Sequence, residues 1–212
     1  FRSLNEGADG LLDENDRPVV LEVEGGEKVY QDFTLSATNP GGHSSRPVHD
    51  NAITHLAGAL VRIGAYDFPV QLNDTTRAYF TAMAPLVDPE TGAAMKALVA
   101  DPTNAAAAAV VSRNPTWNSM LRTTCVATMA SAGHAPNALP QRATANVNCR
   151  IFPGVPVAAV TAQLTAVAAD PKVSVTPDAT TLLTPPPPPL TPAIMGPLRA
   201  QAGKIWPGVP IV

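Results

Sequence analysis

The feature that most constrains the fold of this chain is the order in which two periodicities of apolar residues follow one another. Alternation with a period of two is typical of a strand with one buried face, and recurrence at three and four residues is typical of a helix. The segments, in order, are strand Val29–Thr38, helix Asn51–Tyr66, strand Met120–Ser131, strand Ala143–Phe152, helix Pro156–Ala169 and strand Val173–Thr176. This is the order of the split βαβ, or ferredoxin-like, motif. We therefore predict an α+β fold in which a four-stranded antiparallel sheet carries two helices on one face and leaves its other face uncovered.

The two long middle strands also predict a register. If they form one hairpin centred near Asn137, residues whose numbers sum to 274 face each other. The apolar face would hold Leu121, Cys125, Ala127, Met129, Ala145, Val147, Cys149 and Ile151. The polar face would hold Arg122, Thr124, Thr128, Asn146, Asn148 and Arg150. Cys125 would then lie opposite Cys149, so a disulfide is conceivable, but we expect both to act as small buried hydrophobic residues.

Three further segments surround this motif. Val19–Glu24 alternates and precedes Gly25-Gly26, so we predict an extra N-terminal strand joined to Val29–Thr38 by a hairpin. Residues 72–117 read as an all-helical insertion with helices over Asp74–Ala84, Pro89–Ala100 and Pro102–Ser112. The run Pro185–Pro189 favours polyproline II and cannot pair in a sheet, which sets a boundary near residue 180. We expect three parts: 1–17, 18–180 and a proline-rich linker over 181–212.

Composition excludes several classes of protein. The chain carries 14 Lys and Arg against 17 Asp and Glu, a formal net charge of −3, without runs of basic residues. It has no apolar stretch of the roughly 18 residues that a membrane span needs. We therefore expect no nucleic acid and no membrane as partners. The cysteine content leaves a cytoplasmic and a periplasmic location both open.

Common catalytic motifs are missing, and one histidine stands out. Gly41-Gly42 has no continuation typical of a phosphate-binding loop, and no GxSxG nucleophile elbow occurs. His49 and His55 are most simply solvated residues of the first helix, for which Asp50 is the predicted N-cap. His43 lies in a strand-to-helix loop between Gly42 and Ser44-Ser45, where the backbone can approach a ligand closely.

Three motifs carry a resemblance to a known family. Gly41-Gly42-His43-Ser44-Ser45-Arg46-Pro47, followed by Asn51-Ala52-Ile53, resembles the GGHSSxP...NAI signature of the zinc aminoacylase, carboxypeptidase and desuccinylase family. Asn137-Ala138-Leu139-Pro140 through Ala143 to Arg150 and Pro153 is similar to that family's N-x-x-P...A...R...P segment. Leu4-Asn5-Glu6-Gly7 resembles the stretch that precedes its lid domain, and residues 72–117 resemble the enlarged lid of the carboxypeptidase S-like branch.

The resemblance implies that the chain is a lid, or dimerisation, domain. In the family a catalytic domain holds two zinc ions, so the ends 1–17 and 181–212 would be stubs of that domain, and we expect this part alone to be inactive and to bind no zinc. His43 matches the histidine that reaches across the homodimer to stabilise the charge developing on the scissile carbonyl. Asn137 and Arg150 match substrate-binding residues, and Glu6 matches a carboxylate ligand of one zinc ion.

The function implied is hydrolysis of small peptides or N-acyl amino acids by the longer homodimeric enzyme. The alternative is a stand-alone binding or oligomerisation module with the same fold and no catalysis. For dimerisation, the sequence offers an edge strand and an outer face of the first helix made of His55, Gly58, Ala59 and Arg62.

Overall fold

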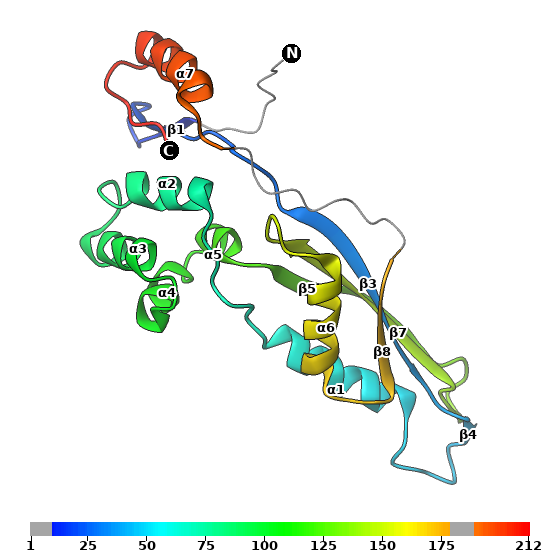
Figure 1. Cartoon of the computed structure of the whole chain (residues 1–212). Coiled ribbons are helices and arrows are strands. Elements are labelled where there is room, and N and C mark those ends of the chain that lie inside the picture. The colour runs from blue at the N-terminus through cyan, green and yellow to red at the C-terminus, as the bar shows by residue number, and fades with distance from the viewer. Residues whose placement is uncertain (1–9, 179–188) are drawn as a thin grey trace. The chain divides into compact units, whose positions relative to one another are not determined.

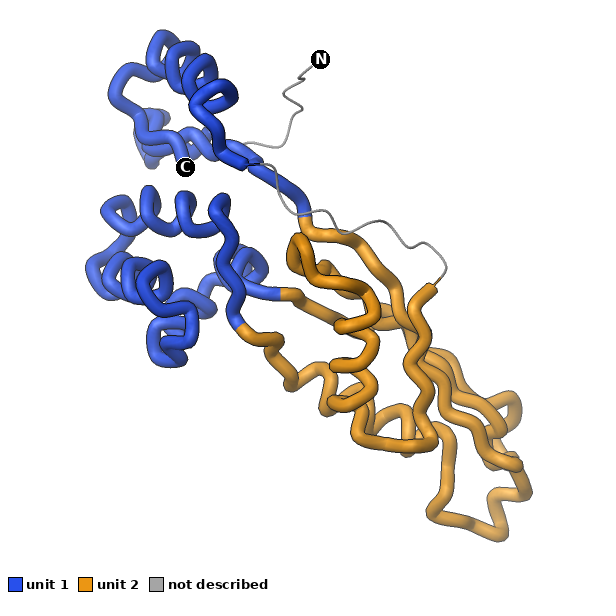
Figure 2. The backbone as a smooth tube through the Cα atoms, in the orientation of Figure 1, with its two compact units in different colours: residues 1–27, 70–122, 186–212 blue, residues 28–69, 123–185 orange. Residues whose placement is uncertain are grey.

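The computed structural model describes residues 10–178 and 189–212. The chain forms two compact units, and each is made of segments that are distant in the sequence (Figure 2). One unit contains residues 28–69 and 123–185, and the other contains residues 1–27, 70–122 and 186–212. Glu6, with its motif, and residues 185–188 of the proline run lie outside the described residues.

The unit of residues 28–69 and 123–185 is a ferredoxin-like fold, as predicted. Its four-stranded sheet has the order β5-β7-β3-β8, and every pairing is antiparallel. The strands are β3 (Val29–Thr38), β5 (Thr124–Ala132), β7 (Arg142–Ile151) and β8 (Val173–Pro177). Helices α1 (Ala52–Gly64) and α6 (Val157–Ala168) cover one face of the sheet, and its other face stays uncovered by helices of this unit (Figure 1).

The core of this unit lies between the sheet and the two helices. Phe33, Leu35 and Ala37 of β3 are fully buried and pair with equally buried residues of β7, so the period-two pattern did place one face inward. From the helices, the buried residues that complete the core are Leu56, Ala59 and Ile63 of α1 and Val160, Leu164 and Ala168 of α6. Burial of this apolar stripe on each helix fixes both helices against the same face of the sheet.

The predicted register of β5 and β7 is right for half of the hairpin. Thr124 pairs with Arg150, Cys125 with Cys149 and Ala127 with Val147, but the register shifts between Ala127 and Met129. Thr128 is the extra residue of this β-bulge, so Met129 pairs with Asn146 instead of Ala145. Met129 is therefore 71% exposed, where we predicted a buried residue.

Two other predictions for this sheet are corrected. Cys125 and Cys149 form a disulfide across 24 residues of sequence, whereas we expected two separate thiols. The register explains the bond, because the two residues are direct cross-strand partners. Arg122 does not join the polar face: it follows helix α5 (Pro115–Leu121) as its C-cap residue and is largely buried.

The start of α1 also differs from prediction. Asn51, not Asp50, is the N-cap, and its side chain accepts a hydrogen bond from the Ile53 backbone N–H at 2.8 Å. Asp50 instead bonds to His55 Nε2 at 3.0 Å, while His55 Nδ1 bonds to Asp170 at 2.7 Å. His55 is thus held between two carboxylates and is not a solvated helix residue.

The insertion in the other unit is helical, as predicted. Its helices are α2 (Asp74–Met83), α3 (Pro89–Ala100), α4 (Ala105–Val111) and α5 (Pro115–Leu121), the last of which we did not predict. Each begins at an Asn or Asp whose side chain accepts a backbone N–H bond: Asn73, Asp88, Asn104 and Asn114. Phe80, Met95, Leu98 and Leu121 form their buried core.

The N-terminal strand has a different partner from the one predicted. Strand β2 (Pro18–Leu21) pairs with β1 (Gly10–Leu12), and no hairpin joins it to β3. The end of the chain supplies further partners, because Leu21 N–H donates to Pro210 O at 2.9 Å and Val23 N–H to Val212 O at 2.8 Å. The segment predicted as a linker contains α7 (Pro192–Ile205). Among the helices of residues 10–178 and 189–212, none combines the length and apolar character that crossing a membrane requires.

Candidate functional site

Two of the recognised motifs meet beyond one end of the sheet. Strand β4 (Gly42–His43) pairs antiparallel with β6 (Ala138–Leu139), with His43 opposite Ala138. The Ser44 backbone N–H also donates to Asn137 O at 3.0 Å. Gly41 allows this approach, because its φ of +82° is one that residues with a side chain rarely adopt. His43 and Asn137 are thereby brought together on exposed loops, although nearly one hundred residues separate them in sequence.

Ser45 determines which nitrogen of His43 can donate. The Ser45 backbone N–H donates to His43 Nδ1 at 3.2 Å, and the Ser45 hydroxyl lies 2.8 Å from the same atom. Because a backbone N–H can only donate, Nδ1 accepts, and the neutral ring carries its proton on Nε2. The neutral His43 ring therefore has its N–H donor at Nε2.

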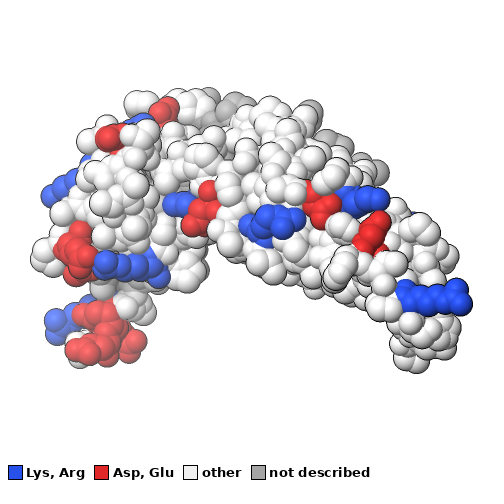
Figure 3. Space-filling model, turned by 90° about the horizontal axis from the view of Figure 1, so that it is seen from below, with Lys and Arg blue, Asp and Glu red and all other residues white. Residues whose placement is uncertain are grey.

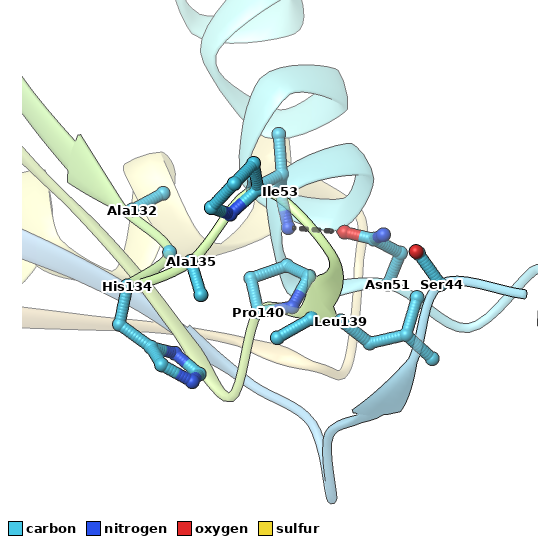
Figure 4. A pocket seen from close by; sticks show the side chains of 11 residues that line it. Ser44, Asn51, Ile53, Ala132, His134, Ala135, Leu139 and Pro140 are labelled. Atoms are coloured by element: carbon cyan, nitrogen blue, oxygen red, sulfur yellow. Dashed lines mark hydrogen bonds between the residues drawn. The ribbon is translucent and has the colours of Figure 1, made fainter.

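A cavity of about 640 Å³ opens beside these loops. It is lined by Ser44, by Asn51 and Ile53 at the start of α1, and by residues 132–136 and 138–140 of the hairpin loop (Figure 4). The bond between Asn51 and Ile53 fixes the helix end at this wall. Polar side chains, namely Ser44, Asn51 and His134, share this lining with apolar ones.

Arg150 lies near the other end of β7, on the uncovered face of the sheet. It pairs across the strands with Tyr30 of β3 and with Thr124 of β5. Its guanidinium carbon is 4.9 Å from the centre of the Tyr30 ring. Side chains on this face form a hydrogen-bonded network around Asp32, as predicted for a polar surface.

Two ionisable groups near Arg150, Asp32 and Lys28, have shifted pKa values. Hydrogen bonds to Asp32 from Tyr30, then from Asn146 and Asn148, hold the pKa of the Asp32 carboxyl below its usual value. Burial, and secondly the charge of Arg150, lower the pKa of Lys28 to about 8. The Lys28 ammonium donates to Thr124 Oγ1 at 2.8 Å, so two basic side chains adjoin Thr124.

The predicted site residues are therefore not gathered in one place. Arg142 and Arg150 are eight residues apart on β7, which corresponds to about 26 Å at about 3.3 Å per residue. His43 and Asn137 lie beyond the Arg142 end, since Asn39 N–H donates to Gln141 O at 2.9 Å before the loops begin. One copy of the chain thus has a His43–Asn137 end and an Arg150 end.

Sequence reasoning missed three residues that shape these ends: Ser45, Tyr30 and Asp32. The signal for Tyr30 and Asp32 lay in the pairing of β3 with β7, in which residue numbers sum to 180. That pairing places Tyr30 opposite Arg150 and Asp32 opposite Asn148. The signal for Ser45 is the Ser44-Ser45 pair directly after His43, although the sequence does not show that Ser45 bonds to the His43 ring.

Metal-binding residues do not cluster in this part of the protein. Within the described part of the chain, no three or more His, Cys, Asp or Glu side chains are placed to hold a metal ion. Glu6, the predicted ligand, lies outside it. Figure 3 shows acidic and basic side chains interspersed over one face of the molecule, with no continuous basic area on the described residues in view.

Comparison with known proteins assigns the chain to a family. Residues 25–176 match the peptidase dimerisation domain family. The chain belongs to this family. The match spans both motif-bearing loops and all but the last residue of the ferredoxin-like sheet, so the resemblance drawn from Gly41–Pro47 and Asn137–Arg150 is confirmed.

Relatives of this peptidase dimerisation domain include hydrolases. The chain is 30% identical over 128 residues to a probable carboxypeptidase S-like 2 of Dictyostelium discoideum, covering 60% of this chain and 24% of that protein. It is 29% identical over 178 residues to the N-fatty-acyl-amino acid synthase/hydrolase PM20D1.1 of Danio rerio, covering 81% of this chain and 34% of that protein. The chain thus spans about a quarter to a third of the length of these relatives.

A solved structure shows the same fold. The M20 family metallo-carboxypeptidase Sso-CP2 from Sulfolobus solfataricus superimposes with a TM-score of 0.53 at 18% sequence identity. The aligned region covers 94% of this chain and 54% of that one.

Proposed function

We propose that this chain is the lid and dimerisation domain of a homodimeric zinc-dependent hydrolase that cleaves the amide bond of N-acyl amino acids or small peptides. The family assignment and the names of the relatives, a probable carboxypeptidase S-like protein and an N-fatty-acyl-amino acid synthase/hydrolase, support the reaction class. The site residues are His43, Asn137 and Arg150. The zinc ions would be held outside the described residues, so no step of the reaction is assigned to a metal here.

The separation of His43 from Arg150 carries the proposal. A dipeptide spans about 7 Å when extended, whereas the two ends of β7 are about 26 Å apart. In a dipeptide and in an N-acyl amino acid alike, the scissile amide and the carboxylate are separated by one amino-acid residue, so the two groups cannot reach His43 and Arg150 of the same copy. In our proposal, each active site takes His43 and Asn137 from one protomer and Arg150 from the other.

His43 would stabilise the transition state. Attack of water on the amide carbonyl places negative charge on the carbonyl oxygen, and a donor aimed there lowers the barrier. The bond from the Ser45 N–H to Nδ1 leaves Nε2–H as that donor. Losing one such donor costs about 3 kcal/mol of barrier, roughly a hundredfold in rate.

Arg150 and Asn137 would bind the substrate. The planar guanidinium of Arg150 is exposed on the sheet and can make two parallel charge-assisted bonds to a carboxylate. The Asn137 side-chain amide, on the exposed loop beside His43, can bond to the amide group being cleaved. Together they would fix the two ends of an N-acyl amino acid.

Dimerisation would use the edge strand β5 and the neighbouring face of α1. Val126 and Met129 of β5 are 59% and 71% exposed, and Ile53 and Val61 of α1 are 45% and 72% exposed. The helix face predicted from sequence is wrong: Ala59 is in the core, and Arg62 donates to Ala168 O at 2.8 Å. An apolar helix stripe beside an unpaired strand edge favours a second copy of the same sheet.

The first experiment would express the longer protein and measure zinc content and hydrolysis of a panel of N-acyl amino acids and dipeptides. We expect hydrolysis that stops when zinc is removed by a chelator and returns when zinc is restored. A protein that dimerises but hydrolyses none of these compounds would support the alternative, a binding module without catalysis.

A further inference from the structure

Tyr30 and Arg150 form a contact on the uncovered face of the sheet. They are direct partners in the ladder of β3 and β7, and the Arg150 guanidinium carbon lies 4.9 Å from the centre of the Tyr30 ring. A guanidinium over an aromatic face at this distance makes a favourable cation–π interaction. Tyr30 is 45% exposed, so this ring is not held by burial in a core.

The Tyr30 ring is anchored at its hydroxyl. Tyr30 Oη donates to Asp32 Oδ2 at 2.7 Å. The other oxygen of Asp32 accepts bonds from the side-chain amides of Asn146 and Asn148, both at 2.9 Å. Asn146 donates in turn to Thr128 Oγ1 at 2.8 Å. The phenol is therefore tied to a network that joins three strands of the sheet.

This network leaves the donors of Arg150 available. The oxygens of Asp32 are occupied by Tyr30 and by two asparagines, although the carboxylate lies only one cross-strand position away from Arg150. Within residues 10–178 and 189–212, the Arg150 guanidinium makes neither a hydrogen bond nor an ion pair with another side chain. The guanidinium carbon lies over the Tyr30 ring, and a guanidinium that contacts an aromatic ring keeps N–H donors in its own plane for a carboxylate.

We propose that Tyr30 is a positioning residue: its ring, anchored through Asp32, orients the Arg150 guanidinium so that its N–H donors meet the carboxylate of the substrate. This inference rests on the proposed role of Arg150 and adds a residue to it. A lysine in place of Arg150 could not stack and donate in this way, because an ammonium is not planar.

The test compares two variants at Tyr30 in the longer, zinc-loaded enzyme. The probes are a substrate found in the panel above and the same compound with its carboxylate converted to a primary amide. Tyr30→Leu removes the ring, and we expect KM for the carboxylate substrate to rise roughly fivefold with kcat within about twofold. Tyr30→Phe keeps the ring and loses only the bond to Asp32, so its rise in KM should be smaller. The amide analogue should show no change in either variant.

Controls separate this inference from the proposed function. Thr34→Val removes a hydroxyl from the same face of β3, one that bonds to Asp178, and should leave KM unchanged. Arg150→Met should raise KM for the carboxylate substrate more than Tyr30→Leu does. If Arg150→Met has no effect, the role of Arg150 is wrong. If Arg150→Met raises KM and Tyr30→Leu does not, or if Tyr30→Leu raises KM equally for the amide, only the positioning role is overturned.

A second measurement needs no turnover. The fast motion of the Arg150 side chain can be followed by the ¹⁵N heteronuclear NOE of its Nε–H group in the 212-residue chain. We expect this NOE to fall in Tyr30→Leu and to stay near the wild-type value in Thr34→Val. An unchanged NOE in Tyr30→Leu would contradict the inference.

Discussion

His43 lies beyond the Arg142 end of strand β7, and Arg150 lies near its opposite end, about 26 Å away along the strand. In our proposal, each copy therefore carries two separate half-sites at opposite ends of one strand ladder. The tautomer of His43 is set at one end by Ser45, and the orientation of Arg150 is set at the other by Tyr30.

Ser45→Ala tests how the tautomer of His43 is set. The variant loses the hydroxyl bond to Nδ1 but keeps the backbone N–H bond, so we expect a fall in kcat of roughly threefold to tenfold with little change in KM. Ser44→Ala is the matched control, since Ser44 uses only its backbone N–H, toward Asn137. Equal effects of the two variants on kcat would contradict this role for Ser45.

The disulfide between Cys125 and Cys149 should stabilise the sheet. It closes a loop of 24 residues, for which chain-entropy estimates give about 3 kcal/mol. We expect Cys125→Ser with Cys149→Ser to lower the free energy of unfolding in urea by this amount. Addition of a reductant should lower it in the wild type but not in the double variant. Identical midpoints for oxidised and reduced wild type would show that the bond is absent in solution.

His55 should make stability depend on pH. The bond to Asp170 above all, and the bond to Asp50, raise the pKa of His55 above 6.5 despite partial burial. The stability that protonated His55 contributes is thus complete below about pH 6.5. It is lost as the pH rises through the raised pKa of His55. Bonds to His55 lower the pKa of Asp50 and of Asp170 below 3.8, so that their contribution is lost only in strong acid.

The measurement is the urea midpoint at about pH 5.5 and about pH 8.5. The wild type should be more stable at the lower pH, and His55→Gln should show a smaller difference between the two. His49→Gln, at an exposed histidine, is the control and should behave like the wild type. A pH dependence that His55→Gln leaves intact would assign the effect to another group.

Charge on the edge of the sheet should break the dimer. Val126→Lys in β5 combined with Val61→Glu in α1 introduces charges where we place the second copy, and should shift sedimentation from dimer to monomer. Ile205→Lys changes a residue of α7 that is 74% exposed and should leave the dimer intact. A double variant that still sediments as a dimer would place the interface elsewhere.

Sequence patterns predicted the sheet and its helices because local periodicity reports directly on burial. Phe33, Leu35 and Ala37 alternate with polar residues, so their face could be assigned before any pairing was known. The bulge at Thr128 could not be predicted, since no glycine marks it and only the pairing with Asn146 reveals it. The disulfide partners were placed opposite each other, but sequence does not show whether two thiols are oxidised.

Contacts between segments that are distant in the sequence also could not be predicted. Asp170 lies 115 residues from His55, and Val212 bonds to a strand at the opposite end of the chain. Such partners depend on the packed fold rather than on neighbouring residues. The site residues His43, Asn137 and Arg150 came from motif resemblance, which says nothing of the distance between them. That distance became known only when β4, β6 and β7 were placed.

The central claim, an active site shared between two copies, is tested most directly by mixing two inactive variants of the longer enzyme. His43→Ala and Arg150→Met are each expected to lose most of their activity as homodimers. After subunit exchange, a mixed dimer has one site with His43 from one copy and Arg150 from the other. Random exchange should therefore restore about one quarter of the wild-type activity. Activity no higher than the sum of the two separate variants would show that both residues serve the same copy, and would contradict the account.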